Sequence, residues 1–488
     1  MKAIEFRCSL DGATVALPHV WERIVGSCHA PLALRADYQG QLRRAHQELG
    51  FQFVRFHGLL GDDMGTLVQQ GKDRVYSFFN AHRIWDALLD LGMRPFVELS
   101  FMPTAIASGH STVFRYRANV TPPKHWSDWG ELVRRLAASA VARYGAPEVE
   151  QWFFEVWNEP NLRAFWRGTR AQYFRLYRET ARALKEISPG LHVGGPSTAQ
   201  NAWIEEFLED CEQTGTAVDF VSTHHYPTDR TVHLSDDVED QLAGMQRDIL
   251  REEAQDARRR AGGMPLFYTE WNTSAHGRDP THDDPYAAAF IIRTVLQANG
   301  LVDAYAFWTF SDLFEEQHFP SHEFHGGFGL LTLHGIAKPS YHAFRLLHRL
   351  GTELVTLIDG MHANVAAWVV RNGHRATVVL INSAPPRHDV VPALVVVHLA
   401  TERTVQAAMI ERIDDTHGNP KDRWLEMGAP EYLRQADVDE LHQASTLRAE
   451  PHQVTWDDTG IHVPVDLPPN SVAAVTLDLA GLPGASHG

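Results

Sequence analysis

The chain has 488 residues, 44% of them hydrophobic, and it carries 44 Lys and Arg against 61 Asp and Glu, a formal net charge of −17. Such a chain can bury a large core and is long enough for one large domain and a smaller one. The acidic excess, which no Lys/Arg-rich run offsets, argues against nucleic acid and anionic membranes as partners.

The three cysteines predict neither a disulfide framework nor a zinc site, because Cys8, Cys28 and Cys211 are scattered in no CxxC or CxxH spacing. The opening "MKAIEFRCSLDG" lacks the continuous apolar core of a signal peptide. No segment reaches about 18 apolar residues without a charge, so no membrane span is predicted. We expect a cytoplasmic protein, and the sequence is compatible with a monomer or a homo-oligomer.

From about residue 20 to residue 350, short β-type runs alternate with longer segments of helical period, which is the pattern of repeated βα units. Helical stretches such as "AQYFRLYRETARALKEISPG" end on a Pro-Gly stop signal. The strand candidates are 23–28, 53–58, 94–100, 152–159, 192–197, 220–226, 266–272 and 304–311.

Eight such units predict a (β/α)8 TIM barrel, an α/β fold, over residues 15–345. A doubly wound open sheet is the main alternative, but it normally has a Gly-rich phosphate turn after an early strand. The Gly-rich "GGFGL" at 326–330 follows the last strand and opens no helix. Nucleotide binding is therefore not expected.

Residues 346–488 read as a β-sandwich. Two alternating runs, "NVAAWVV" and "ATVVLIN", flank Asn372-Gly373, a strong hairpin signal. The N-terminal segment 1–14 also alternates, so we expect its strand to join this second domain. The charged stretch 411–445 looks like a long excursion from the same domain.

Polar residues end nearly every predicted strand of the barrel, where the active sites of TIM barrels are built. Cleavage of a glycosidic bond needs two carboxyl groups facing each other across the anomeric carbon. Glu159 and Glu270 end the fourth and seventh strands, 111 residues and three βα units apart. Because the residue before a proline disfavours the helical region, we expect Pro160 to hold Glu159 extended over the barrel mouth.

Glu155 lies on the same strand as Glu159 but cannot be its catalytic partner. Four residues along a strand span about 13 Å, beyond either catalytic spacing. We expect Glu155 to lie deeper in the barrel, paired with an interior arginine such as Arg55.

Two of these strand ends, "FFEVWNEPN" and "FYTEWNTS", resemble the acid/base and nucleophile motifs of family 39 glycoside hydrolases. Further segments across the barrel, including "FHGLLGDDMG", "NVTPPKHW", "WTFSDLFEE" and "FHGGFGL", resemble the β-xylosidase branch of that family.

The resemblance implies a retaining β-glycosidase without metal or cofactor, in which Glu159 is the general acid/base and Glu270 the nucleophile. The two carboxyl groups should then lie about 5 Å apart. We expect the nearby Glu270 and partial burial to raise the pKa of Glu159, so that it can donate a proton near neutral pH.

Carried over from the family, further positions resemble those that bind the sugar. Alternation lets only one of His224 and His225 face the mouth, and we favour His224. One of Glu315 and Glu316 should bind hydroxyl groups. The resembling positions are Asn158, His57, His224, Tyr226, Phe114, Trp308, Glu315 and Glu316.

The leading hypothesis for the substrate is a xylo-oligosaccharide, cleaved from its non-reducing end by an exo-acting β-1,4-xylosidase. An α-L-iduronidase-like enzyme would need cations to hold the C5 carboxylate, for which Arg115 and Arg117 are candidates. Activity on α-L-arabinosides is a further alternative. A non-catalytic carbohydrate-binding barrel would have lost one of the two carboxylates, and this chain retains both.

Overall fold

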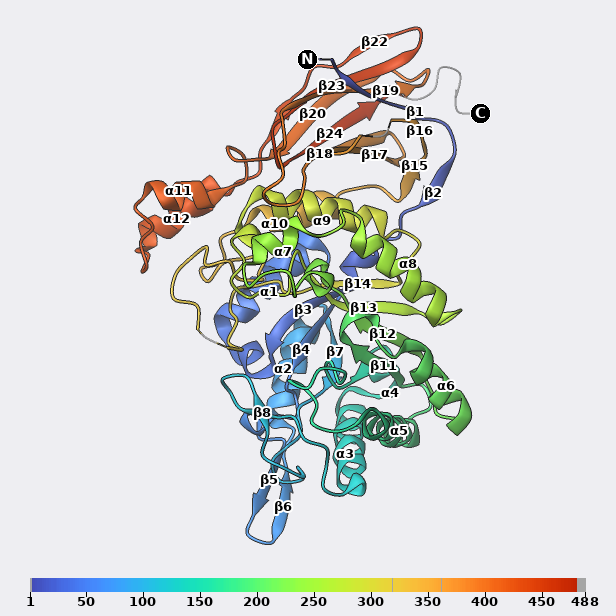
Figure 1. Ribbon diagram of the computed structural model, residues 1–488, viewed down its shortest axis with the longest axis vertical. Coiled ribbons are helices and arrows are strands. Elements are labelled where there is room, and N and C mark those ends of the chain that lie inside the picture. Colours follow the sequence, from blue (N-terminus) through green and yellow to red (C-terminus); the bar gives the residue numbers. More distant parts are fainter. Residues whose placement is uncertain (1, 318, 361, 481–488) are drawn as a thin grey trace.

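The computed structural model describes residues 2–317, 319–360 and 362–480. Within these residues, eight parallel strands close into a barrel surrounded by helices (Figure 1), as predicted, and not into an open sheet. In barrel order the strands are β3 (Ile24–His29), β4 (Phe53–His57), β7 (Arg94–Leu99), β10 (Phe153–Val156), β11 (His192–Thr198), β12 (Phe220–His224), β13 (Leu266–Trp271) and β14 (Ala304–Phe307), and β14 pairs with β3.

Each barrel strand is followed by a helix of the outer ring (Figure 1). Local signals set several helix ends: a capping box of Thr169 and Gln172 starts α5, and Gly50, at a φ of 77°, ends α1. The ring helices are α1 (Ala36–Leu49), α2 (Phe79–Asp90), α3 (Trp126–Tyr144), α5 (Arg170–Ile187), α6 (Ile204–Thr214), α8 (Ile249–Ala261), α9 (Pro285–Gln297) and α10 (Pro339–His348). Shorter elements in the loops are α4 (Ala146–Val149), α7 (Val238–Ala243) and the hairpins β5 (Leu67–Gln70)–β6 (Asp73–Tyr76) and β8 (Thr112–Val113)–β9 (Ala118–Asn119).

The barrel interior is layered. Its lowest layer is an apolar cluster of Ile24, Phe53, Phe96, Phe220, Phe267, Ala304 and Ala306, packed against Phe153. Because strand side chains alternate, the next inward positions lie two residues further along. On β4, β7 and β10 these positions are Arg55, Glu98 and Glu155, all fully buried or nearly so. A charged layer therefore underlies the barrel mouth.

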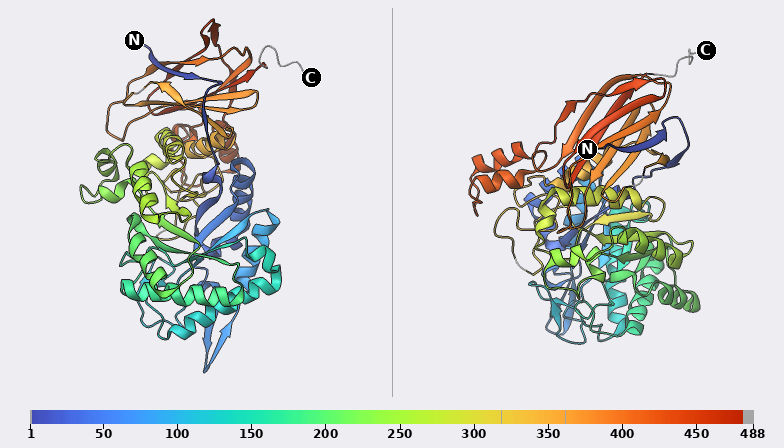
Figure 2. Two further views of the ribbon diagram at one scale, coloured as in Figure 1. Left: turned by 90° about the vertical axis from the view of Figure 1, so that its right-hand side faces the viewer. Right: turned by 45° about the horizontal axis from the view of Figure 1, so that its top comes forward.

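The C-terminal region forms two sheets that pack face to face (Figure 2). The five-stranded sheet, counted over the described residues, has the order β16 (Leu357–Asp359), β1 (Ile4–Ser9), β19 (Ala393–Ala400), β23 (Gly460–Leu467) and β22 (Thr455–Asp457). The seven-stranded sheet, counted likewise, has the order β2 (Thr14–Ala16), β15 (Glu353–Val355), β17 (Val365–Asn372), β18 (Arg375–Asn382), β24 (Ser471–Leu479), β20 (Val405–Ile413) and β21 (Ala449–Pro451). Side chains from both sheets, such as Val397 and Val475, share one core.

The seven-stranded sheet also shares the barrel's core. Val379 and Val472 belong to the same apolar cluster as Ile291 of α9 and Phe344 of α10. The sheets lie against the side of the barrel that these two helices form (Figure 1). Barrel and sheets are therefore joined by a continuous apolar interior.

Residues 411–445 contain two helices, α11 (Pro420–Glu426) and α12 (Gln435–Ala444), which extend from the sheets beside the barrel (Figure 1). Trp424 and Leu441 of these helices pack against Phe324 and Ile336 in the loop after β14.

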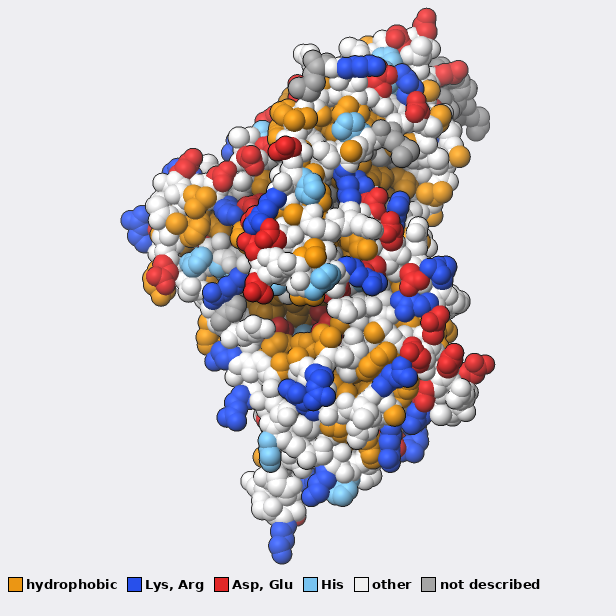
Figure 3. Space-filling model, in the orientation of Figure 1, with side chains coloured by type: hydrophobic (Ala, Val, Ile, Leu, Met, Phe, Trp, Pro, Cys, Tyr) orange, Lys and Arg blue, Asp and Glu red, His pale blue; other side chains and the backbone are white. Residues whose placement is uncertain are grey.

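Acidic and basic side chains are interspersed over the face shown in Figure 3. No helix in the described part of the chain is long and apolar enough to cross a membrane.

Candidate active site

The end of β10 differs from the prediction. The strand stops at Val156, and Glu159 is not extended but has a φ of 44°, with Trp157 also at a positive φ of 72°. The Glu159 amide donates to the carbonyl of Ser197 on the neighbouring strand, over 2.8 Å, and its own carbonyl accepts from the Leu162 amide. The tertiary bond to Ser197 and the local turn bond to Leu162 hold a conformation that sequence alone does not favour.

Glu159 and Glu270 face each other at the barrel mouth. One carboxylate oxygen of each and a ring nitrogen of His224 all lie within 4.8 Å of one another. Both glutamates are at least nine-tenths buried. This spacing matches the separation of about 5 to 5.5 Å in retaining glycosidases rather than the 6.5 to 9.5 Å of inverting ones.

The two carboxyl groups have different partners. Glu270 accepts from Arg55 Nη1 over 2.7 Å and from the Tyr226 hydroxyl over 3.0 Å. Glu159 has His224 Nδ1 at 3.0 Å from its Oε1. Burial lowers the pKa of His224 to about 4, so this imidazole is neutral at pH 7. The two glutamates therefore lie in different surroundings: Glu270 contacts a cation and a hydroxyl group, and Glu159 contacts a neutral imidazole.

The pKa of Glu159 is raised to about 7, first because burial disfavours the charged form, with a smaller contribution from Glu98. His57 and Arg55 act in the opposite direction. The expected rise is present, but the neighbouring carboxylate that contributes to it is Glu98, not Glu270 as we predicted. A group with this pKa can act as a proton donor near neutral pH.

Arg55 organises the floor of the site. Its guanidinium donates to Glu155 over 2.6 Å, which confirms the predicted pair, and it lies 2.9 Å from Glu98. It also donates to Asn158 Oδ1 over 3.0 Å. This last bond fixes the amide's orientation and leaves its NH₂ group as the end available to a ligand.

His57 and Glu316 form one wall. His57 Nδ1 lies 2.6 Å from Glu98, and Nε2 lies 3.6 Å from Glu270 and 3.4 Å from Glu316. Burial opposes protonation of His57, but these carboxylates raise its pKa to about 9. Glu316 is buried and its pKa is raised to about 8, chiefly by burial. Glu315 instead pairs with Arg35 at 3.2 Å, away from the cavity.

A cavity of about 760 Å³ opens above these groups. Trp308 lies over the mouth because Gly26 leaves room for it: a Cβ on Gly26 would lie 2.6 Å from the indole ring. Of the predicted site residues, His57, Phe114, Asn158, Glu159, Tyr226, Glu270, Trp308 and Glu316 line the cavity.

His224 and Glu315 are the predicted residues outside that lining. His224 has no exposed surface and lies beneath the carboxylates, where its Nε2 is 3.1 Å from the Thr269 hydroxyl. His225 points to the other side of the strand and stacks on Tyr268. His224 is thus the histidine turned toward the glutamates, but it supports them and does not face the cavity.

Several lining residues were absent from our predicted site, among them Leu162, Phe165, Gln200, Asp229 and Arg278. They come from loops beyond the strand ends, and apart from Asp229 no pattern in the sequence marked them. Asp229 had the clearest signal, since it follows the strand end "HHY" by three residues.

Glu159, His224 and Glu270 form a group with the residue types and spacing to hold a metal ion. However, the Arg55 guanidinium already lies 2.7 Å from Glu270 and would repel a cation there. The arrangement therefore favours proton transfer and nucleophilic attack over metal binding.

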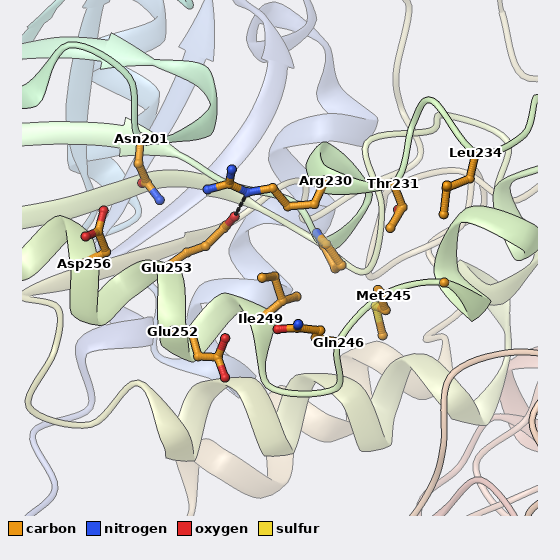
Figure 4. Close-up of a pocket in the computed structure, with 12 residues that line it drawn as sticks. Asn201, Arg230, Thr231, Leu234, Met245, Gln246, Ile249, Glu252, Glu253 and Asp256 are labelled. Atoms are coloured by element: carbon orange, nitrogen blue, oxygen red, sulfur yellow. Dashed lines mark hydrogen bonds and ion pairs between the residues drawn. The ribbon is translucent and has the colours of Figure 1, made fainter.

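A second cavity, of about 510 Å³, lies behind the loop after β12 (Figure 4). Arg230, from the turn η5 (Pro227–Arg230), crosses it and pairs with Glu253 of α8 over 2.9 Å. The other side of the same turn carries Asp229, which lines the first cavity.

The chain is similar to known proteins over most of its length. Residues 7–462 match the family model "Glycosyl hydrolases family 39". A β-xylosidase of Caldicellulosiruptor saccharolyticus is 44% identical over 464 residues, covering 94% of this chain and 95% of that protein. The human α-L-iduronidase is 29% identical over a shorter stretch, 36% of this chain and 27% of that protein.

Among solved structures, a monomeric β-xylosidase from Caulobacter crescentus CB15 superposes with a TM-score of 0.84 at 31% identity, covering 98% of this chain and 99% of that one. With the family model matched over nearly the whole chain, the protein is a glycoside hydrolase that belongs to glycosyl hydrolases family 39.

Proposed function

We propose that the protein is a retaining, exo-acting β-xylosidase that releases xylose from the non-reducing ends of xylo-oligosaccharides. The observation that carries the proposal is the pair Glu159 and Glu270, with oxygens within 4.8 Å and contrasting partners. The 44% identity to a β-xylosidase supports the choice of sugar.

In the first step, Glu270 attacks the anomeric carbon while Glu159 donates its proton to the leaving oxygen. A covalent ester forms between the sugar and Glu270, and the released chain departs. Glu159, now ionised, takes a proton from water, which attacks the anomeric carbon and frees xylose with retained configuration. The Tyr226 hydroxyl and Arg55 hold the Glu270 carboxylate in place before attack.

The remaining residues of the inner cavity bind the xylose ring under this proposal. Asn158 donates to the hydroxyl next to the bond being broken, His57 and Glu316 hold further hydroxyl groups, and Phe114 and Trp308 pack on the ring. We assign His224 to positioning Glu159, because it contacts that carboxyl group and does not line the cavity. Residues 15–345 would carry this chemistry, with residues 346–488 as the supporting domain.

The site lacks the two cations that we predicted for an α-L-iduronidase, although another arginine, Arg278, lines the cavity. Neither of the candidate cations, Arg115 and Arg117, lines the cavity. Arg115 lies over the Phe319 ring and 3.7 Å from Glu315. Glu316, within the cavity, would repel the C5 carboxylate of an iduronide only above about pH 8, because its carboxyl group is protonated at neutral pH.

Azide rescue tests both roles. Replacing Glu270 with Gly should lower hydrolysis of an aryl β-xyloside by several orders of magnitude, and azide should then yield the α-xylosyl azide, of inverted configuration. Replacing Glu159 with Ala should instead yield the β-xylosyl azide, because the covalent ester still forms. If the two variants give the same anomer, or if Glu270→Gly keeps its activity, the assignment is wrong.

A further inference from the structure

The cavity is larger than a single pentose ring requires. Pockets of about 300 to 1,000 Å³ enclose whole drug-sized ligands, and this one has about 760 Å³. The residues proposed to hold xylose make up only part of its lining. Other lining residues, from the loops beyond the strand ends, have no assigned role.

The chemistry fixes the side on which the leaving group must lie. Glu159 protonates the leaving oxygen, so the departing sugar lies next to Glu159 and away from Glu270. The end of β11 and the loop after it flank this side: Ser197 accepts from the Glu159 amide, and the Asn161 side chain donates to the Ala199 carbonyl over 3.0 Å. Leu162, Phe165, Gln200 and Asp229 form the adjoining wall.

Asp229 is the ionisable group of that wall. Its Oδ2 accepts from the Tyr226 amide over 2.9 Å, and the Gln200 side chain hydrogen-bonds to the same carboxyl group. Burial raises its pKa to about 8. It remains partly exposed and lines the cavity, so it can offer a ligand a strong acceptor or, when protonated, a donor.

The turn that carries Asp229 is held by an ion pair on the side of the second cavity. Arg230 lines the second cavity instead and pairs with Glu253 (Figure 4). Glu253 is nine-tenths buried and lies 3.5 Å from His225 Nδ1. Because His225 is flanked in sequence by His224 and Tyr226, the same anchor holds Asp229 and the two residues that contact the catalytic pair. The orientation of Asp229 is thus built into the fold.

We propose that Asp229 and Gln200 form a subsite for the leaving sugar, with Asp229 bonding one of its hydroxyl groups, Gln200 a neighbouring one, and Phe165 and Leu162 packing on the ring. The inference rests on the proposed function and adds to it: the enzyme selects a sugar, rather than any leaving group, at this position. Neither residue takes part in the bond changes at the anomeric carbon.

The test compares two substrates with the same glycone. Asp229→Asn keeps an oxygen to accept from the Tyr226 amide but replaces the other with a donor, so the fold should hold. With a pKa of about 8, Asp229 is mostly protonated at pH 7, and loss of a hydrogen bond between neutral groups typically costs a factor of about 2 to 10. We expect kcat/KM for xylobiose, divided by that for 4-nitrophenyl β-xyloside, to fall several-fold at pH 7 in both Asp229→Asn and Gln200→Ala.

A second readout uses the covalent intermediate. With the aryl xyloside as donor and added xylose as acceptor, Asp229→Asn should lower the ratio of transfer to hydrolysis, because the acceptor enters through the same subsite. The matched control is Asp236→Asn, an exposed aspartate further along the same loop; it should leave both ratios unchanged.

The outcomes separate the two proposals. If Asp229→Asn lowers both substrates equally, or changes neither ratio, the subsite is wrong while the β-xylosidase assignment stands. If the unmodified enzyme cleaves neither xylobiose nor the aryl xyloside, the proposed function itself fails.

Discussion

Arg55 determines the charge balance around the two glutamates. It is fully buried among Glu98, Glu155 and Glu270, and His57 supplies a second positive charge, since its pKa is about 9. Breaking a buried ion pair by removing one partner costs roughly 3 to 5 kcal/mol, because it leaves a charge without compensation. The cluster therefore fixes where negative charge is tolerated, and the protons remain on Glu159 and Glu316 up to near neutral pH.

This charge pattern predicts the alkaline limb of the pH profile. Glu159 donates only when protonated, and its pKa is about 7. Thus kcat/KM for 4-nitrophenyl β-xyloside should fall as pH rises through about 7, by about tenfold per unit well above it. For 2,4-dinitrophenyl β-xyloside, whose leaving group needs little protonation, the decrease of kcat/KM with rising pH should be much weaker.

The variant Glu159→Gln provides the control for this profile. Glu316 and His57 also titrate at alkaline pH, at about 8 and 9. Only a limb that disappears in Glu159→Gln belongs to Glu159, and a limb near pH 7 that persists in the variant would contradict the assignment of the acid.

At the scale of elements, the loop after β14 depends on one buried cation. Lys338, which precedes α10, lies 2.6 Å from Asp283 and 2.7 Å from Asp312, and it donates to the Gly327 carbonyl over 3.0 Å. All three charged groups are fully buried. This cluster ties the Gly-rich stretch, which the sequence did not explain, to the segment leading to Glu316.

We predict that Lys338→Met destabilises the protein by about 3 to 5 kcal/mol, because it leaves two buried carboxylates without a cation. The lower midpoint should appear in urea unfolding followed by tryptophan fluorescence. Lys72→Met, at the exposed turn between β5 and β6, is the control and should change stability by less than about 0.5 kcal/mol. Equal midpoints for the two variants would exclude the anchoring role.

The elements show what the sequence could predict. The alternation of short β-type runs with helical segments, together with the turn residues between them, located all eight barrel strands. The spacing of three βα units placed Glu159 and Glu270 on opposite sides of the mouth. The backbone of Glu159 was not predictable, because its positive φ depends on a bond to Ser197 from another strand. The hairpin was predicted one residue early: Asn372 still pairs with Arg375, and the turn is Gly373-His374.

Loop residues of the site were missed for a related reason. The position of Asp229 depends on the pairing of its neighbour Arg230 with Glu253, which is distant in the sequence. Similarly, Glu315 and Glu316 are adjacent and alike, and their directions differ because Glu315 pairs with Arg35 and Arg115 whereas Glu316 lies beside His57. Local patterns carry no information on such contacts.

At the scale of the whole molecule, barrel and sheets share one apolar cluster that includes Val379, Val472 and Phe344. Such a shared interior predicts that the two parts unfold together. Calorimetry should give a single transition whose calorimetric and van't Hoff enthalpies agree, and residues 1–345 alone should fail to yield a soluble, cooperatively folded protein. Two separate transitions would show that the sheets are an independent module.

The central claim is that Glu270 carries the sugar during catalysis. It is tested most directly by incubating the enzyme with an activated 2-deoxy-2-fluoro-β-xyloside and locating the label by mass spectrometry of proteolytic peptides. The account predicts one sugar per chain, on the peptide containing "FYTEWN" and attached to Glu270. A label on Glu159, Glu98 or Glu316, or no label on an enzyme that the reagent inactivates, would contradict it.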